Sequence, residues 1–94
     1  MATTLFVSLV AVAEILLDRV LANSSLKPSK RSDTLVRRAE VRVRLGKFAE
    51  ALADAMETLA VTGDDATLKA AVEMKLLEIE EGFPAYAAYL KSQR

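Results

Sequence analysis

The sequence predicts an all-α protein in which about five helices form antiparallel hairpins within one domain. Three observations favour this fold class. Alanine, leucine, glutamate, lysine and arginine dominate while aromatic residues make up 5% of the chain, a composition typical of helices rather than sheets. The few glycines and prolines stand between segments with helical periodicity. A length of 94 residues suffices for a single core, so we expect one domain over residues 1–94.

The composition excludes several classes of function. The chain has no cysteine and no histidine, and therefore no thiolate nucleophile, no thiolate metal site and no imidazole base. Glu78, Glu80 and Glu81 have no partner acid, base or ligand set beside them, and the three glycines are isolated, so no phosphate-binding loop is formed. We therefore expect a protein that is not an enzyme and has no metal or cofactor. Absence of cysteine suits a reducing compartment, and we expect a cytoplasmic location.

Charge is segregated along the chain. Residues 27–47 contain eight cations and two anions, whereas residues 50–81 contain two cations and nine anions. Such a pattern either steers a charged partner or is neutralised internally when helices dock, and the sequence leaves both open. The basic stretch would suit phosphates, but the acidic second half, the pI of about 6.3 and the lack of interleaved aromatics argue against nucleic acid as a partner.

The first predicted helix, residues 4–22, is apolar nearly all round. Its uncharged run ends at Glu14, short of the roughly 20 residues that span a bilayer, so a membrane span is not expected. The "AVA" at residues 11–13 resembles a signal-peptide cleavage site, but no cation precedes it. We expect a helix buried in the core, or one whose outer face meets a second chain. The predicted oligomer or partner face comprises Leu5, Leu9, Val12 and Leu16.

A polar, basic linker is expected at residues 23–32, followed by a helical hairpin at residues 33–62. Ser32 or Asp33 is the expected N-cap of the first arm. That arm has one apolar face, formed by Leu35, Val36, Ala39 and Val43. Gly46 is expected to end it in a left-handed conformation, and a second periodic segment starts at Phe48. The short turn predicts antiparallel arms whose alanines allow close approach.

A second hairpin is expected at residues 65–92. Gly63 closes the preceding helix, and Asp64 or Asp65 caps the next one, which runs from about residue 66 to 81. Gly82 ends that helix. Pro84 suits the first turn of a short terminal helix, because proline lacks a donor that would be unpaired there.

The first hairpin resembles a tetratricopeptide repeat (TPR), particularly the variety found in co-chaperones. The resemblance covers about residues 33–62, a third of the chain, with degenerate repeats on both sides. It is carried by Arg38-Ala39, Arg44-Leu45-Gly46-Lys47-Phe48, Glu50-Ala51-Leu52, Asp54-Ala55 and Leu59. It implies that Ala39 and Ala51 lie where the helices cross, Gly46 makes the turn, Phe48 fills the mouth of the hairpin and Leu59 packs toward the next repeat.

The resemblance implies a TPR-like right-handed α-α superhelix and a non-catalytic protein–protein interaction module, either an adaptor or an accessory subunit. Co-chaperone repeats often hold a C-terminal carboxylate, but Arg37 occupies the position that commonly holds the asparagine of that clamp. Arg37 and Arg44, one heptad apart, are expected to bind an acidic peptide, with Arg38 and Lys47 as further partner-binding candidates. The alternative is that these cations are solvated or paired with acids of the chain. A homodimer formed through the apolar first helix also stays open.

Overall fold

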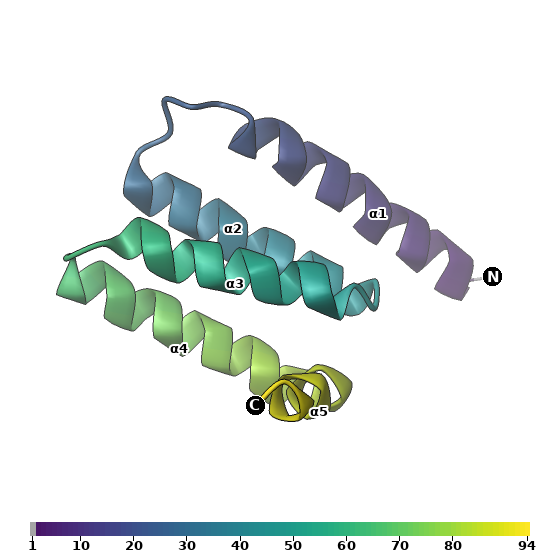
Figure 1. Ribbon diagram of the computed structural model, residues 1–94. Helices are drawn as coiled ribbons and strands as arrows, with labels where there is room; N and C mark the ends of the chain where they lie inside the picture. The colour runs from purple at the N-terminus through teal and green to yellow at the C-terminus, as the bar shows by residue number, and fades with distance from the viewer. Residues whose placement is uncertain (1) are drawn as a thin grey trace.

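The computed structural model describes residues 2–94, with side chains described from Ser8 onward. This part of the chain forms five α-helices and no β-strand, which confirms the all-α prediction. The helices are α1 (Ala2–Leu21), α2 (Pro28–Arg44), α3 (Phe48–Thr62), α4 (Ala66–Gly82) and α5 (Pro84–Ser92). Figure 1 shows α1 to α4 side by side, with α1 at one edge and α5 crossing the end of α4 at the other.

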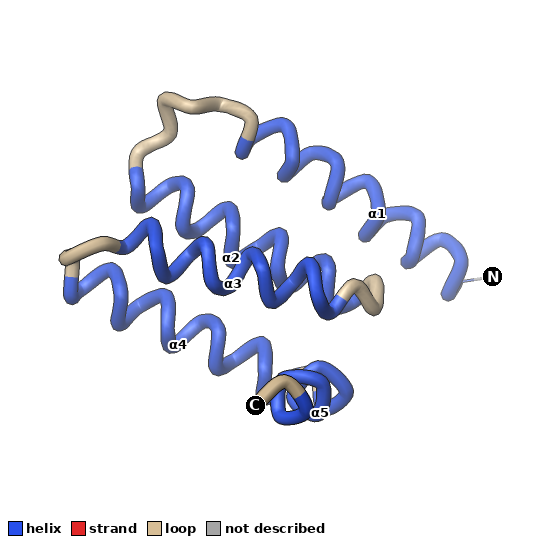
Figure 2. The backbone as a smooth tube through the Cα atoms, in the orientation of Figure 1, coloured by secondary structure: helices blue, strands red, loops and turns tan. Residues whose placement is uncertain are grey.

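Helices α2 and α3 are each followed by a glycine that makes the turn to the next helix. Gly46 and Gly63 have φ of 76° and 54°, a left-handed conformation that glycine adopts without a steric penalty. Asp65 caps α4, because its Oδ1 accepts a hydrogen bond from the backbone N–H of Leu68 at 3.0 Å. Pro84 occupies the first turn of α5. These turns are short, and Figure 2 shows that the longest connection joins α1 to α2.

The start of α2 differs from the expectation. The helix begins at Pro28, inside the range predicted to be a linker, so the connection spans residues 22–27. Proline is favoured in a first helical turn, and the polar residues after it continue the helix instead of preceding it. Ser32 and Asp33 are therefore not caps. The Ser32 hydroxyl donates to the carbonyl of Ser29 at 3.0 Å, and Asp33 forms ion pairs.

The α2–α3 hairpin is the most tightly packed part of the fold. Ala39 and Ala51 are 2% and 0% exposed, so the two helices meet over small side chains. Phe48 lies 5.6 Å from Tyr86 and 5.7 Å from Tyr89 between ring centroids, which ties the start of α3 to α5. The buried core that joins helices α2 to α5 consists of Val36, Val43, Ala51, Val72, Ile79 and Tyr86.

Helix α1 is an edge helix and not the centre of the core. It packs against α2, and Val10 is buried there. Several of its large apolar side chains nevertheless remain exposed, because no other helix of residues 2–94 covers the outer side of α1 (Figure 1). The expectation of a buried central helix therefore does not hold for the described chain. Within residues 2–94, no helix combines the length and apolarity that crossing a membrane requires.

Candidate functional site

The arginines of α2 lie on two sides of the helix. Arg38 and Arg42, four residues apart, face α1 and α3, where Asp18, Glu14 and Asp54 accept their hydrogen bonds. Arg37 and Arg44, seven residues apart, line a groove between α2 and α4. Spacings of four and seven residues each return to one face of a helix, so the two pairs occupy separate faces. The basic residues of α2 are therefore divided between two different surfaces of the helix.

The first surface is an internal ionic network centred on Asp54 of α3. The side chain of Asp54 is 2% exposed. It accepts hydrogen bonds from Arg38 Nε at 3.0 Å and Arg38 Nη2 at 2.7 Å, and from Arg42 Nη1 at 3.1 Å to each oxygen. Two guanidinium groups thus satisfy one buried carboxylate, which is the condition for keeping such a charge inside a protein.

Helix α1 joins this network through two carboxylates. Glu14 accepts from Arg42 Nε at 2.9 Å and from Lys47 Nζ at 2.7 Å, and Asp18 accepts from Arg38 Nη1 at 2.9 Å. The hydrogen bond from Lys47 is the main cause that lowers the pKa of Glu14. Burial opposes this shift by desolvating the carboxylate, while the hydrogen bond from Arg42 and the charges of both cations lower the pKa further. The hydrogen bonds to Asp54 raise the pKa of Arg38. The network therefore holds α1, α2 and α3 together as charged partners at neutral pH.

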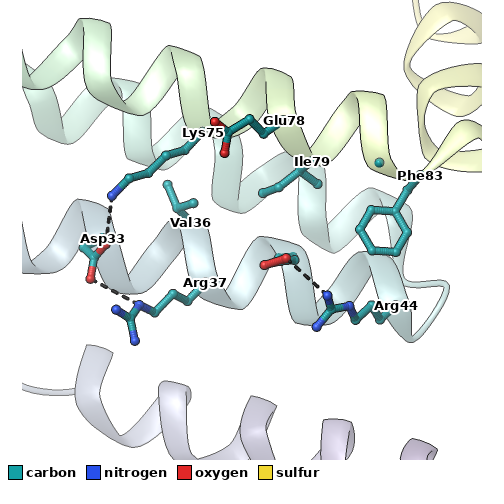
Figure 3. Close-up of a pocket in the computed structure, with 10 residues that line it drawn as sticks. Asp33, Val36, Arg37, Arg44, Lys75, Glu78, Ile79 and Phe83 are labelled. Atoms are coloured by element: carbon teal, nitrogen blue, oxygen red, sulfur yellow. Dashed lines mark hydrogen bonds and ion pairs between the residues drawn. The ribbon is translucent and has the colours of Figure 1, made fainter.

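The second surface is the groove between α2 and α4, which encloses about 570 Å³ (Figure 3). Its floor is apolar and consists of Val36, Ile79 and Phe83, and its rim is charged. The rim side chains that line it are Asp33, Arg37, Glu40, Arg44, Lys75 and Glu78. Three cations and three carboxylates make the rim neutral overall, and all three cations form ion pairs with Asp33 or Glu40.

The ion pairs on this rim are solvent-exposed and weak. Asp33 is shared between Arg37 Nε at 3.2 Å and Lys75 Nζ at 3.1 Å, while Arg44 Nη2 lies 3.4 Å from Glu40 (Figure 3). Exposed pairs of this kind contribute about 0.2–1 kcal/mol each. An arginine of the rim can therefore exchange its present carboxylate partner for a carboxylate of a ligand at a small cost in free energy. The guanidinium of Arg44 also lies 5.6 Å from the centre of the Phe83 ring, which orients it over the groove floor.

The predicted partner-binding cations are thus separated by the fold. Arg37 and Arg44 line the groove, whereas Arg38 is in the internal network and Lys47 pairs with Glu14. Of the predicted outer face of α1, Leu9, Val12 and Leu16 are exposed, while the side chain of Leu5 lies outside the described residues. Leu59, expected to pack toward a following repeat, is 37% exposed and borders a second depression with Leu52, Leu76 and Leu90.

Sequence reasoning did not identify Asp33, Lys75, Ile79 and Phe83 as parts of the groove. Asp33 precedes Arg37 by four residues, a spacing that predicts an ion pair on one helix face. Lys75, Ile79 and Phe83 carried no such local signal, because they reach the groove through the packing of α4 against α2. No cluster of side chains within residues 2–94 is suited to hold a metal ion. The groove therefore combines an apolar floor with a rim of exposed ion pairs.

Comparisons with protein-family models, with curated protein sequences and with solved structures found no match.

Proposed function

We propose that the chain is a non-catalytic protein–protein interaction module of TPR-like form, which binds a peptide segment of a partner in the groove between α2 and α4. One observation carries the proposal. Arg37 and Arg44 lie on the rim of a groove whose floor is formed by Val36, Ile79 and Phe83. Absence of cysteine makes a reducing compartment such as the cytoplasm the proposed location.

The order of the helices supports the proposal. Helices α2 and α4 are the first members of the successive pairs α2–α3 and α4–α5, and both line the groove. The second pair is not the antiparallel hairpin that was expected, because α5 crosses the end of α4 (Figure 1). In arrays of helical hairpins, equivalent arms stack side by side and form a continuous concave surface that binds partners. The resemblance of residues 33–62 to a TPR implies the same use of the first arm.

The side chains of the groove indicate which residues a bound peptide should contain. One apolar side chain would cover Val36 and Ile79, which lie at the centre of the floor. Two carboxylates about 10 Å apart would match Arg37 and Arg44, since seven residues of helix span about 10.5 Å. Each arginine would exchange a weak pair within its own helix for a charge-assisted hydrogen bond to the peptide. The neutral rim provides no long-range attraction, so we expect a dissociation constant of roughly 1 μM to 1 mM.

Fluorescence anisotropy with a labelled octapeptide of alternating leucine and glutamate tests the proposal. The chain contains no tryptophan, so a tryptophan added to the peptide gives a second, independent signal. We expect saturable binding, and about tenfold weaker binding when Arg37 and Arg44 are both replaced by alanine, which corresponds to about 1.4 kcal/mol. The same peptide with lysine in place of glutamate should bind more weakly than the acidic one.

Lys69→Ala is the matched control, because Lys69 is an exposed cation of α4 outside the groove. That variant should bind the acidic peptide as well as the original chain. Binding that is unaffected by the Arg37 and Arg44 replacements, or that weakens equally with Lys69→Ala, would contradict the proposed site. Circular dichroism of each variant checks that the helices are intact.

A further inference from the structure

The outer side of α1 presents a continuous row of exposed apolar side chains, here called the outer stripe. Its exposed members are Leu9 (62%), Val12 (51%), Ile15 (53%), Leu16 (52%) and Val20 (37%). Leu9, Val12 and Leu16 follow the three- and four-residue spacing of a helix–helix contact seam. A row of this length on a helix at the edge of the fold is a surface that requires a cover.

The ionic network fixes which side of α1 faces outward. Glu14 and Asp18 point to the cations of α2 and to Lys47, so the acidic residues of this helix are on its inner side. The outer stripe is left without a carboxylate, and Arg19 is the cation nearest its C-terminal end. A second helix can therefore pack on the stripe without desolvating an acid.

The exposed area of the whole chain is larger than that of a compact monomer of the same mass. The accessible surface is 6168 Å² for a chain of 10.2 kDa. A compact monomer of this mass exposes about 5300 Å², by the usual scaling of surface with mass. The excess, about 850 Å², is close to the share of about 800 Å² that one partner contributes to a standard protein interface.

We propose that the outer stripe is the interface between two copies of this chain, whose α1 helices pair antiparallel around a two-fold axis near Val12. In this arrangement Leu9 of one copy lies opposite Leu16 of the other, and Val12 lies near its own counterpart. Such an interface is self-complementary, as a two-fold axis requires. Ala13, a small residue beside the axis, permits close approach of the two backbones.

Charge selects the antiparallel direction. In a parallel pair, Arg19 of one copy would lie beside Arg19 of the other and repel it. In the antiparallel pair the two side chains are separated by about 20 Å along the helices, at 1.5 Å per residue. That distance exceeds the screening length of about 8 Å at physiological salt. The dimer forms on the side of α1 opposite to α2, so it leaves the groove between α2 and α4 open on each copy.

Size-exclusion chromatography with light scattering tests the pairing. The intact chain should have twice the mass of 10.2 kDa, and Leu16→Glu should return it to the mass of one chain. Met74→Glu is the matched control, because Met74 is equally apolar and 64% exposed on α4. A single-chain mass for the intact protein, or a dimer that persists in Leu16→Glu, would overturn the proposal. A dimer lost in Met74→Glu would place the interface elsewhere and overturn it too.

Single cysteines give a second test that does not depend on the folding of the glutamate variant. The chain has no native cysteine, so each introduced thiol reports on one position. Under mild oxidation, Val12→Cys should form a disulfide-linked dimer at least tenfold faster than Val20→Cys or Met74→Cys. Equal rates for Val12→Cys and Val20→Cys would show a parallel pair, and equal rates for Val12→Cys and Met74→Cys would show random collision. Either result overturns the antiparallel dimer.

Discussion

Asp54→Ala removes the centre of the ionic network and should strongly destabilise the fold. The replacement deletes the acceptor of four hydrogen bonds from Arg38 and Arg42, whose side chains are 16% and 17% exposed. Removing one partner of a buried ion pair typically costs about 3–5 kcal/mol, because the remaining charge is buried without compensation. Each arginine keeps one carboxylate of α1, Asp18 or Glu14, so we expect the lower end of this range, about 3 kcal/mol.

Urea denaturation followed by circular dichroism measures this change. A domain of 94 residues has a total stability of about 5–14 kcal/mol, so the loss is a large fraction of it. The melting temperature should fall by about 12–24 °C, at about 4–8 °C per kcal/mol for a domain of this size. Asp33→Ala is the control, because it breaks ion pairs at the surface and should cost less than about 1 kcal/mol.

A triple variant separates the cost of an unpaired charge from the value of the network itself. Replacing Asp54 by leucine and both Arg38 and Arg42 by methionine removes the buried carboxylate together with both of its guanidinium partners, while Glu14 keeps its hydrogen bond from Lys47. Hydrophobic replacement of a whole buried ionic cluster is often neutral or stabilising. We therefore expect the triple variant to regain most of the stability lost in Asp54→Ala. A loss below about 1 kcal/mol for Asp54→Ala, equal to that of Asp33→Ala, would refute the reasoning.

Two further predictions concern α1 and the first hairpin. Because the pKa of Glu14 is lower in the folded chain than in the unfolded one, the unfolded chain binds the extra proton. The stabilisation by Glu14 is fully present above about pH 4.3 and is lost as the pH falls through the lowered value. Urea denaturation at several pH values should show that Glu14→Gln reduces this acid-dependent loss; an unchanged pH profile would contradict the role of Lys47. Ala51→Leu should cost about 1–3 kcal/mol through overpacking, because Ala51 is fully buried where α2 meets α3. Thermal unfolding measures it, with Ala53→Leu at an exposed position of α3 as control; equal melting temperatures would show that the helices are not in close contact.

Local signals predicted the elements of the fold. Periodic apolar residues indicate where the helices lie, and the glycines at positions 46 and 63 indicate where two of them end. Both signals depend on only a few neighbouring residues. The same signals misplaced the start of α2. The stretch around Pro28 is polar and basic, and its helix is supported by the first-turn proline instead of by an apolar face.

Contacts between residues far apart in the chain were harder to predict from the sequence. The segregated charge was compatible with internal pairing, and Asp54 does pair with Arg38 and Arg42. The other acids of the network, Glu14 and Asp18, come from α1 and precede the acidic half of the chain. The position of Asp54 did contain a signal, since it lies three residues after Ala51 and four before Thr58, on the buried face of α3.

The groove was predictable on one side. Arg37 and Arg44 are related by helical spacing on α2, whereas Lys75 and Phe83 reach the same groove from about 40 residues further along the chain. Their approach depends on how α4 packs against α2, and packing between hairpins is set by tertiary contacts instead of local periodicity.

Amide chemical-shift mapping by nuclear magnetic resonance tests most directly whether the chain is a peptide-binding module. On titration with the octapeptide of leucine and glutamate, we expect the shifts to concentrate in residues 33–44 of α2 and in residues 75–83, which form the last turns of α4 and the residue that follows it. The outer stripe on α1 should be unaffected. Shifts that concentrate on α1 or α5, or the absence of saturable shifts at millimolar peptide, would contradict binding in the groove between α2 and α4.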